Sequence, residues 1–103
     1  MSGNPLTSGL RPVHPGELLR EDVLPALGRP KAEIARLLGV SRQTLYDILG
    51  EKQPITAAMA RRIGKLCGDG PMIWLSMQQL YDVKAAEREL AAELAAIPTL
   101  AAA

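Results

Sequence analysis

Cysteine, histidine and long apolar runs are scarce in this sequence of 103 residues. The single cysteine, Cys67, cannot form an internal disulfide. No charged opening segment followed by about 7–15 apolar residues marks a secretory signal, and no apolar run approaches the roughly 20 residues of a membrane-spanning helix. We therefore expect a soluble protein of the cytoplasm that has no membrane partner.

Few side chains are suited to catalysis. The sequence has one histidine and lacks C-x-x-C, H-E-x-x-H and glycine-rich phosphate-loop motifs. His14 precedes a proline at a predicted helix start, where capping or packing is the simpler role. Cys67 falls on the apolar side of a predicted helix, with no basic neighbour there to activate it. We expect no enzymatic activity, no metal site and no cofactor.

Basic residues are concentrated in the middle of the chain. The formal charge is +1 overall. Residues 29–65 hold eight basic and three acidic side chains, a net charge of +5, whereas residues 69–103 hold two and five, a net charge of −3. A basic segment in a nearly neutral protein indicates a surface that meets an anionic polymer, although a solvated face explains many such runs.

Prolines, glycines and capping residues predict five helices and no strand. Residues 1–13 have too little to bury and are expected to form a flexible arm. The first helix starts at Pro15 with His14 as its cap and is expected to end by Pro25. The later helices are predicted from Pro30 to Gly39, after the cap Ser41 to Gly50, after the cap Thr56 to Gly68, and from Pro71 as far as Ile97.

The third predicted helix has one apolar and one polar side. At 100° per residue, Leu45, Ile48 and Leu49 lie together, whereas Gln43 and Asp47 project from the opposite side. The major groove of B-DNA accepts one α-helix, and each base pair there shows a distinct set of donors and acceptors. Long polar side chains at the exposed beginning of a helix are suited to reading that set.

Three side chains are the predicted base contacts. Arg42 can bind guanine O6 and N7, and Gln43 can bind adenine N6 and N7, each worth about 1–3 kcal/mol of discrimination. Asp47 can accept a hydrogen bond from cytosine N4, but phosphate repels it, and pairing with a neighbouring Lys or Arg is an equally good alternative. The predicted phosphate contacts from this region are Ser41, Thr44, Lys52 and Tyr46, the last with packing as its alternative.

Two predicted helices joined by a short turn with a glycine form a helix-turn-helix pattern. The run AEIARLLGVSRQTLYDILGEKQPITAAMARRIGKL resembles the lambda-repressor-like (Xre) helix-turn-helix family. The flanks HPGELLREDVLPALG and PMIWLSMQQLYDVKAAE resemble the HigA group of antitoxins. The resemblance covers about residues 13–87 and implies an all-α, five-helix fold with a long C-terminal helix. It also implies a backbone contact for Lys31, at the start of the second helix.

The resemblance implies partners as well. HigA-like proteins bind and inhibit a HigB-type toxin, a small basic RelE-like ribonuclease, and repress their own operon. A homodimer on a palindromic operator is expected, because specific repressors usually bind two half-sites. The DNA-binding domain is expected over residues 14–83, followed by a helical extension and tail over residues 84–103. The alternative is a stand-alone Xre repressor without a toxin partner.

The partner surface is predicted on the fifth helix, which opens with the apolar residues M-I-W-L. Trp74 is expected to anchor the core, which leaves the other sides of this turn for a partner. A second apolar stripe lies in an acidic, alanine-rich stretch that could pair with its twin, bind the toxin or stay in solvent. The predicted dimer or partner surface consists of Met72, Ile73, Leu75, Leu90 and Leu94.

Overall fold

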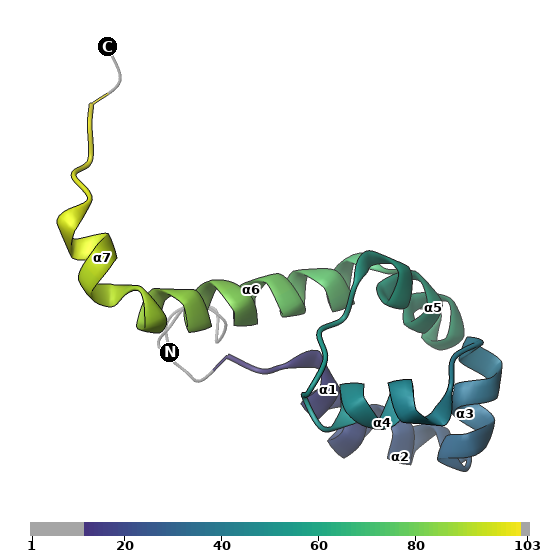
Figure 1. The fold of residues 1–103 in the computed structure, drawn as a ribbon. Helices are drawn as coiled ribbons and strands as arrows, with labels where there is room; N and C mark the ends of the chain where they lie inside the picture. Colours follow the sequence, from purple (N-terminus) through teal and green to yellow (C-terminus); the bar gives the residue numbers. More distant parts are fainter. Residues whose placement is uncertain (1–11, 102–103) are drawn as a thin grey trace, which may run out of the picture.

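The computed structural model describes residues 12–101, which form helices joined by loops, without any strand (Figure 1). The segments are α1 Pro15–Leu18, the π-helix η1 Leu19–Val23, α2 Leu24–Leu27, α3 Lys31–Leu38, α4 Arg42–Leu49, α5 Ala57–Cys67, α6 Met72–Glu89 and α7 Ala91–Ala96. α1, η1 and α2 follow one another without a loop and together form the first predicted helix. α3, α4 and α5 are the second, third and fourth predicted helices, and α6 and α7 together correspond to the fifth. The all-α fold is confirmed. Of the predicted arm, residues 1–11 lie outside the described residues.

The first helix begins where it was predicted to begin. The ring Nδ1 of His14 accepts a hydrogen bond of 2.9 Å from the Gly16 N–H, so His14 caps α1. A Cβ on Gly16 would lie 1.9 Å from the carbonyl oxygen of Ile48. Only glycine therefore allows α1 to approach the backbone of α4 this closely.

The same helix ends later than predicted. The prediction of an end by Pro25 is wrong, since α2 continues to Leu27 and stops at Gly28, which has a left-handed φ of 67°. The π turn of η1 is closed by a hydrogen bond from the Leu24 N–H to the Leu19 carbonyl. This wider turn lies directly before Pro25 and accommodates its ring, which would clash with the preceding turn of a regular α-helix.

α3 and α4 form the predicted helix-turn-helix. Gly39 ends α3 with a left-handed φ of 75°. The Val40 N–H bonds to the Ala35 carbonyl at 3.0 Å and the Gly39 N–H bonds to the Arg36 carbonyl at 3.1 Å, which is the Schellman arrangement. Ser41 then caps α4. The chain thus passes from one helix to the next across Gly39–Ser41.

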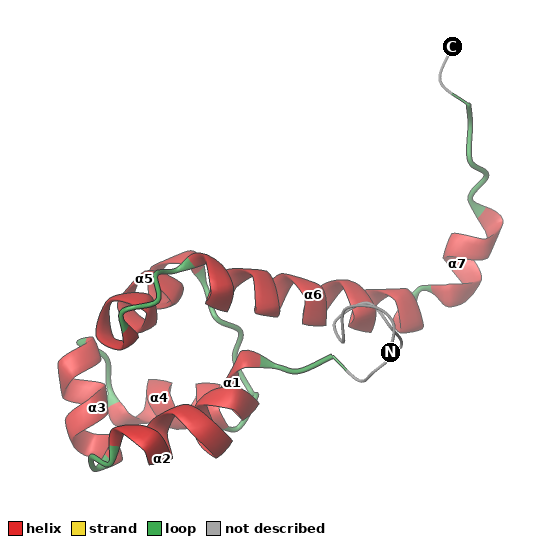
Figure 2. Ribbon diagram, turned by 180° about the vertical axis from the view of Figure 1, so that it is seen from behind, coloured by secondary structure: helices red, strands yellow, loops and turns green. Residues whose placement is uncertain are grey.

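The core lies between α4 and α5, with α2, α3 and the start of α6 around it (Figure 2). The chain contains no phenylalanine, so aliphatic side chains and Trp74 fill this space. Trp74 is 2% exposed, and its indole N–H donates to the Asp69 carboxylate at 3.0 Å, which confirms its predicted place in the core. The buried apolar residues are Leu19, Leu24, Ile34, Ala35, Leu38, Leu45, Ile48, Leu49, Ile55, Met59, Ala60, Ile63 and Trp74.

The distal half of α6 projects from the domain (Figure 1). The prediction of one helix as far as Ile97 is wrong, because Leu90, with φ −104° and ψ 15°, divides it and α7 ends at Ala96. α7 has no buried residue, so the tertiary packing that stabilises most helices does not keep it in line with α6. None of the described helices is both long enough and apolar enough to cross a membrane.

Candidate nucleic-acid interface

α4 is held to the core by one side and exposes the other. Leu45, Ile48 and Leu49 are 2%, 0% and 4% exposed, whereas Arg42 and Gln43 are exposed. The apolar and polar sides predicted from the sequence are confirmed. The rigid attachment matters because side chains that read bases must be presented at a fixed position.

Arg42 begins α4 with a free side chain. Within residues 12–101 its guanidinium makes no hydrogen bond and no ion pair. A guanidinium has several N–H donors in a fixed planar fork, which matches guanine edges and phosphate oxygens. All of these donors remain available for a ligand.

Gln43 and Asp47 are bonded to each other on the exposed side of α4. The Gln43 side-chain amide donates a hydrogen bond of 2.8 Å from Nε2 to the Asp47 Oδ1. The amide keeps its carbonyl oxygen and a second N–H, which is the acceptor and donor pair that adenine requires. Asp47 therefore orients Gln43, and the alternative in which it pairs with a Lys or Arg is not found within the described part of the chain.

The predicted phosphate contacts differ in how free they are. Lys31 and Lys52 are exposed and make no side-chain bond among the described residues. Ser41 is used locally: its Oγ accepts from the Thr44 N–H at 3.0 Å and donates to the Thr44 Oγ1 at 3.0 Å. The hydroxyl hydrogen of Thr44 stays available, and Tyr46 is 47% exposed. Ser41 is thus the least available of the five as a phosphate donor.

Two arginines cap the helices of the helix-turn-helix, and neither cap was predicted from the sequence. Arg20 Nη1 donates to the Leu49 carbonyl at 2.6 Å, at the end of α4. Arg62 Nη1 donates to the Leu38 carbonyl at 2.8 Å, at the end of α3. Each cation satisfies a terminal carbonyl and complements the negative end of a helix dipole. The hydrogen bond to Glu21 is the main cause that raises the pKa of Arg20 above its usual value.

Gln78 fixes the loop that follows α4. Its side chain is 4% exposed, its Oε1 accepts from the Ile55 N–H at 2.8 Å, and its Nε2 donates to the Asp82 carboxylate at 2.9 Å. A buried amide with both ends bonded specifies one position of the loop against α6. The sequence offers no local signal for this contact.

His14 and Cys67 occupy structural positions. His14 is 3% exposed and its ring meets Tyr81 edge-on at 5.0 Å, and burial lowers the pKa of the imidazole. Burial, with the Asp69 charge, raises the pKa of the Cys67 thiol, which disfavours the reactive thiolate. No group of three or more His, Cys, Asp or Glu side chains among residues 12–101 could hold a metal ion.

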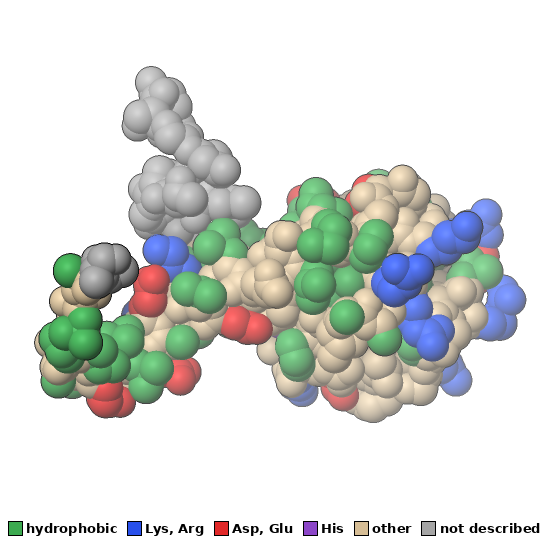
Figure 3. Space-filling view, turned by 90° about the horizontal axis from the view of Figure 1, so that it is seen from above, with side chains coloured by type: hydrophobic (Ala, Val, Ile, Leu, Met, Phe, Trp, Pro, Cys, Tyr) green, Lys and Arg blue, Asp and Glu red, His purple; other side chains and the backbone are tan. Residues whose placement is uncertain are grey.

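Most of the predicted partner surface is exposed. Met72 is 63%, Ile73 52%, Leu90 43% and Leu94 45% exposed. Leu75 is half-buried and packs against the protein's own core, so it offers a partner less area than was expected. Figure 3 shows Lys and Arg side chains gathered at the end of the domain where α5 lies, while Asp and Glu side chains lie both on the domain and along the α6–α7 end.

No protein-family model matches the chain. Virulence-associated protein I of Dichelobacter nodosus is 39% identical over 77 residues, which cover 75% of this chain and 71% of that protein. Antitoxin HigA-1 of Vibrio cholerae is 30% identical over 73 residues, which cover 71% of this chain and 68% of that protein. The solved structure of the Pseudomonas aeruginosa antitoxin HigA with the higBA promoter matches with a TM-score of 0.83 and 34% identity, over 88% of this chain and 100% of that one. In sequence and in structure, the chain therefore belongs to the HigA family of helix-turn-helix antitoxins.

Proposed function

We propose that this protein represses its own operon by inserting α4 into the major groove of operator DNA, and that it binds and neutralises a HigB-like ribonuclease toxin. The observation that carries the DNA-reading role is the free guanidinium of Arg42 next to the bonded pair of Gln43 and Asp47, all on one helix that is fixed to the core. Arg42 would bind guanine and Gln43 adenine, while Asp47 holds Gln43 and accepts from cytosine N4. The phosphate contacts would be Lys31, Ser41, Thr44, Tyr46 and Lys52.

A homodimer on a palindromic operator is part of the proposal. One module buries only about 600–1,000 Å² on DNA, and specific repressors usually join two half-sites. Residues 14–83 would form the DNA-binding domain, and residues 84–103 would be a helical extension and tail. Exposed apolar side chains supply the surface for the second copy or the toxin: Met72, Ile73, Leu90 and Leu94, with a smaller share from Leu75.

The toxin partner is supported by the family and by charge. The Vibrio cholerae relative is named an antitoxin, and the Pseudomonas aeruginosa structure holds HigA with the promoter of a higBA pair. Residues 69–103 carry a net charge of −3, which suits a basic partner. Both relatives are named as antitoxins. We therefore propose that this protein has no enzymatic activity and needs no cofactor. We also propose that it acts in the cytoplasm.

Binding to the DNA upstream of its own coding sequence tests the first role. The protein should bind this DNA specifically, and Arg42→Ala/Gln43→Ala should abolish specific binding without changing the helical circular dichroism. About six neutralised phosphates would give a slope near −5 for log affinity against log salt. Unchanged operator affinity in the double variant would contradict the assignment of the reading residues.

Co-expression with the product of an adjacent small basic reading frame, followed by pull-down, tests the toxin role. A complex that relieves the growth defect caused by that product would support it. Specific operator binding without such a complex would leave the stand-alone repressor as the function.

A further inference from the structure

α5 carries a basic surface that the proposed function does not use. Arg61, Arg62 and Lys65 are exposed on its outward side. Within residues 12–101, Arg61 and Lys65 make no hydrogen bond or ion pair, and Arg62 uses one guanidinium nitrogen on the Leu38 carbonyl. Figure 3, which views the molecule from the side of α5 and α6, shows the Lys and Arg side chains gathered at this end. Their charge is therefore not neutralised by the described part of the chain.

The two free cations line a pocket of about 350 Å³. Its other lining residues are Gly64, Gly68, Gly70 and Pro71. A Cβ on Gly64 would lie 2.2 Å from the carbonyl carbon of Gly70, so the loop lies directly on α5 and fixes the backbone at this side of the pocket. Arg61 and Lys65 are four residues apart, about 6 Å along the helix axis, a spacing similar to that of successive phosphates on one DNA strand.

The chemistry of this surface fits phosphate better than protein. The pocket lining contains neither a carboxylate nor a large apolar side chain. Protein interfaces depend on buried aromatic or aliphatic anchors, for which this lining offers nothing. Asp69, the acid nearest in the loop, is turned to the Trp74 indole. A guanidinium and an ammonium group without a competing acid are well suited to hold phosphate oxygens.

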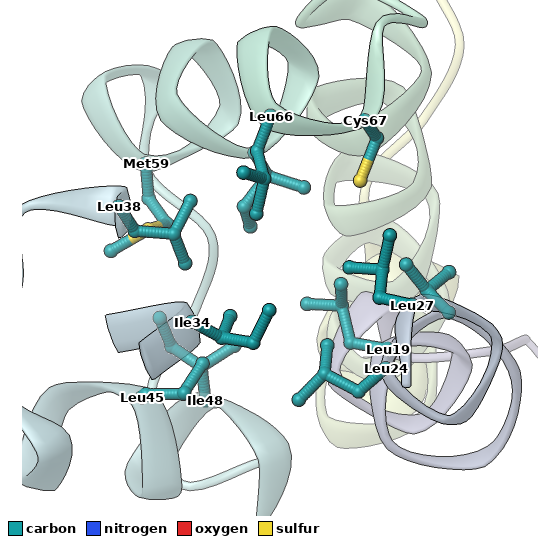
Figure 4. A pocket seen from close by; sticks show the side chains of 12 residues that line it. Leu19, Leu24, Leu27, Ile34, Leu38, Leu45, Ile48, Met59, Leu66 and Cys67 are labelled. Atoms are coloured by element: carbon teal, nitrogen blue, oxygen red, sulfur yellow. The ribbon is translucent and has the colours of Figure 1, made fainter. Parts of the chain in front are cut away.

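The surface lies away from the reading helix. Figure 4 shows the side chains of α5, such as Leu66, on one side of the core and those of α4, such as Leu45 and Ile48, on the opposite side. A duplex whose groove holds α4 would therefore not pass over α5. We propose that Arg61 and Lys65 form a sequence-independent surface for the phosphodiester backbone of a second DNA segment, so that one protein joins two segments. Only the assignment of the first segment to α4 rests on the proposed function.

The test measures a second duplex on full-length protein already saturated with unlabelled upstream DNA. A fluorescent duplex of random sequence is added, and its anisotropy is followed over a range of salt concentrations. The parent should bind it, and Arg61→Ala/Lys65→Ala should weaken this binding at least about tenfold and lower the salt slope by about 2, since two phosphate contacts are lost. Lys84→Ala/Arg88→Ala removes the same charge from α6 and should leave the second-duplex affinity within about twofold of the parent.

Two results would overturn the proposal. One is that the unsubstituted protein, saturated with upstream DNA, binds no second duplex. The other is that both double variants lose the same amount of affinity for the second duplex. A site for free phosphate would be identified instead if inorganic phosphate shifted the backbone amide resonances of residues 61–70 and the duplex did not. A change in oligomeric mass on Arg61→Ala/Lys65→Ala without DNA would identify the acidic segment of a second copy as the occupant.

Failure of the proposed function would look different. If the upstream DNA is not bound at all, the operator role of α4 fails. The random duplex added to the protein alone, with the same two double variants, still measures the α5 surface.

Discussion

The side-chain amide of Gln43 donates a hydrogen bond of 2.8 Å to the carboxylate of Asp47, one turn further along α4. Such a pair stabilises a helix by only about 0.2–0.5 kcal/mol. Its larger effect is on orientation, because Gln43 is held with its carbonyl oxygen and one N–H free before any ligand arrives. Less side-chain entropy is then lost on binding. Asp47, the one acidic residue of α4, thereby gains a role that does not require it to touch DNA.

Replacing Asp47 tests that role. Asp47→Ala should leave the fold intact. It should reduce the preference for adenine at the base that Gln43 contacts by about 1 kcal/mol, since the Gln43 amide loses its fixed orientation. Affinities for a set of operators with single base changes would measure this. Asp47→Asn is the matched control, because its amide oxygen still accepts the bond and should keep most of the preference. An accompanying loss of preference for cytosine would measure the proposed contact of Asp47 with cytosine N4. An unchanged preference for adenine in Asp47→Ala would contradict the orienting role.

Removal of the Arg20 side chain should destabilise the end of α4. Arg20 donates to the Leu49 carbonyl at 2.6 Å and to the Glu51 carboxylate at 3.3 Å. Arg20→Ala leaves the part-buried carbonyl without its charged donor, and we expect the free energy of unfolding to fall in urea titrations. Arg29→Ala is the control, since within residues 12–101 Arg29 pairs with Glu33 alone, at the surface, and this variant should cost under about 0.5 kcal/mol. Equal losses would show that the cap contributes nothing beyond surface charge.

The local features of the fold were predictable from the sequence, and the long-range ones were not. The caps at His14 and Ser41 and the turn at Gly39 depend on residues within a few positions, so their signals lie in short motifs. The bonds from Arg20 to Leu49 and from Ile55 to Gln78 join residues 29 and 23 positions apart, and no periodicity encodes them.

The two errors in helix length both arise from features of the folded chain that the local sequence does not show. The sequence shows the proline at position 25 but not the π turn that accommodates it, and it shows the apolar spacing around Leu90 but not the absence of buried residues in α7. The exposed polar side of α4 was predictable because amphipathicity is local, whereas base reading by its residues stays a prediction. The hydrogen bond from Gln43 to Asp47 was missed, although its spacing of four residues was visible.

Substitution of Gly16 should be far more damaging than substitution of another glycine. A Cβ at Gly16 would lie 1.9 Å from the Ile48 carbonyl oxygen, which is backbone and cannot move aside alone. Gly16→Ala should therefore separate α1 from α4 and lower the free energy of unfolding by about 3 kcal/mol or more, as overpacking of a core does. At Gly28 an added Cβ meets nothing within 4 Å, so Gly28→Ala should cost only the left-handed strain of about 1 kcal/mol. Similar melting curves for the two variants would contradict the close approach of the helices.

The stability of the fold should fall as the pH is lowered through the titration of His14. Burial lowers the pKa of the imidazole below its usual value of 6.5, and the charges of Glu51 and Asp82 offset this only in part. The capping Nδ1 accepts the Gly16 N–H, and it can do so only while that nitrogen is unprotonated.

The direction in which stability changes with pH follows from where His14 binds its proton more tightly. The unfolded chain takes up this proton at a higher pH than the folded one, so acid favours unfolding. The stabilisation is complete above pH 6.5 and is lost as the pH falls from there to the lower pKa of the folded state, below which the loss is constant. Urea titrations across this range should show the slope in the parent. His14→Asn should lack it, because an asparagine amide caps a helix without titrating, while the carboxylates contribute equally to both proteins. Parallel pH profiles of the two proteins would mean that His14 keeps the same proton affinity in the folded and unfolded states.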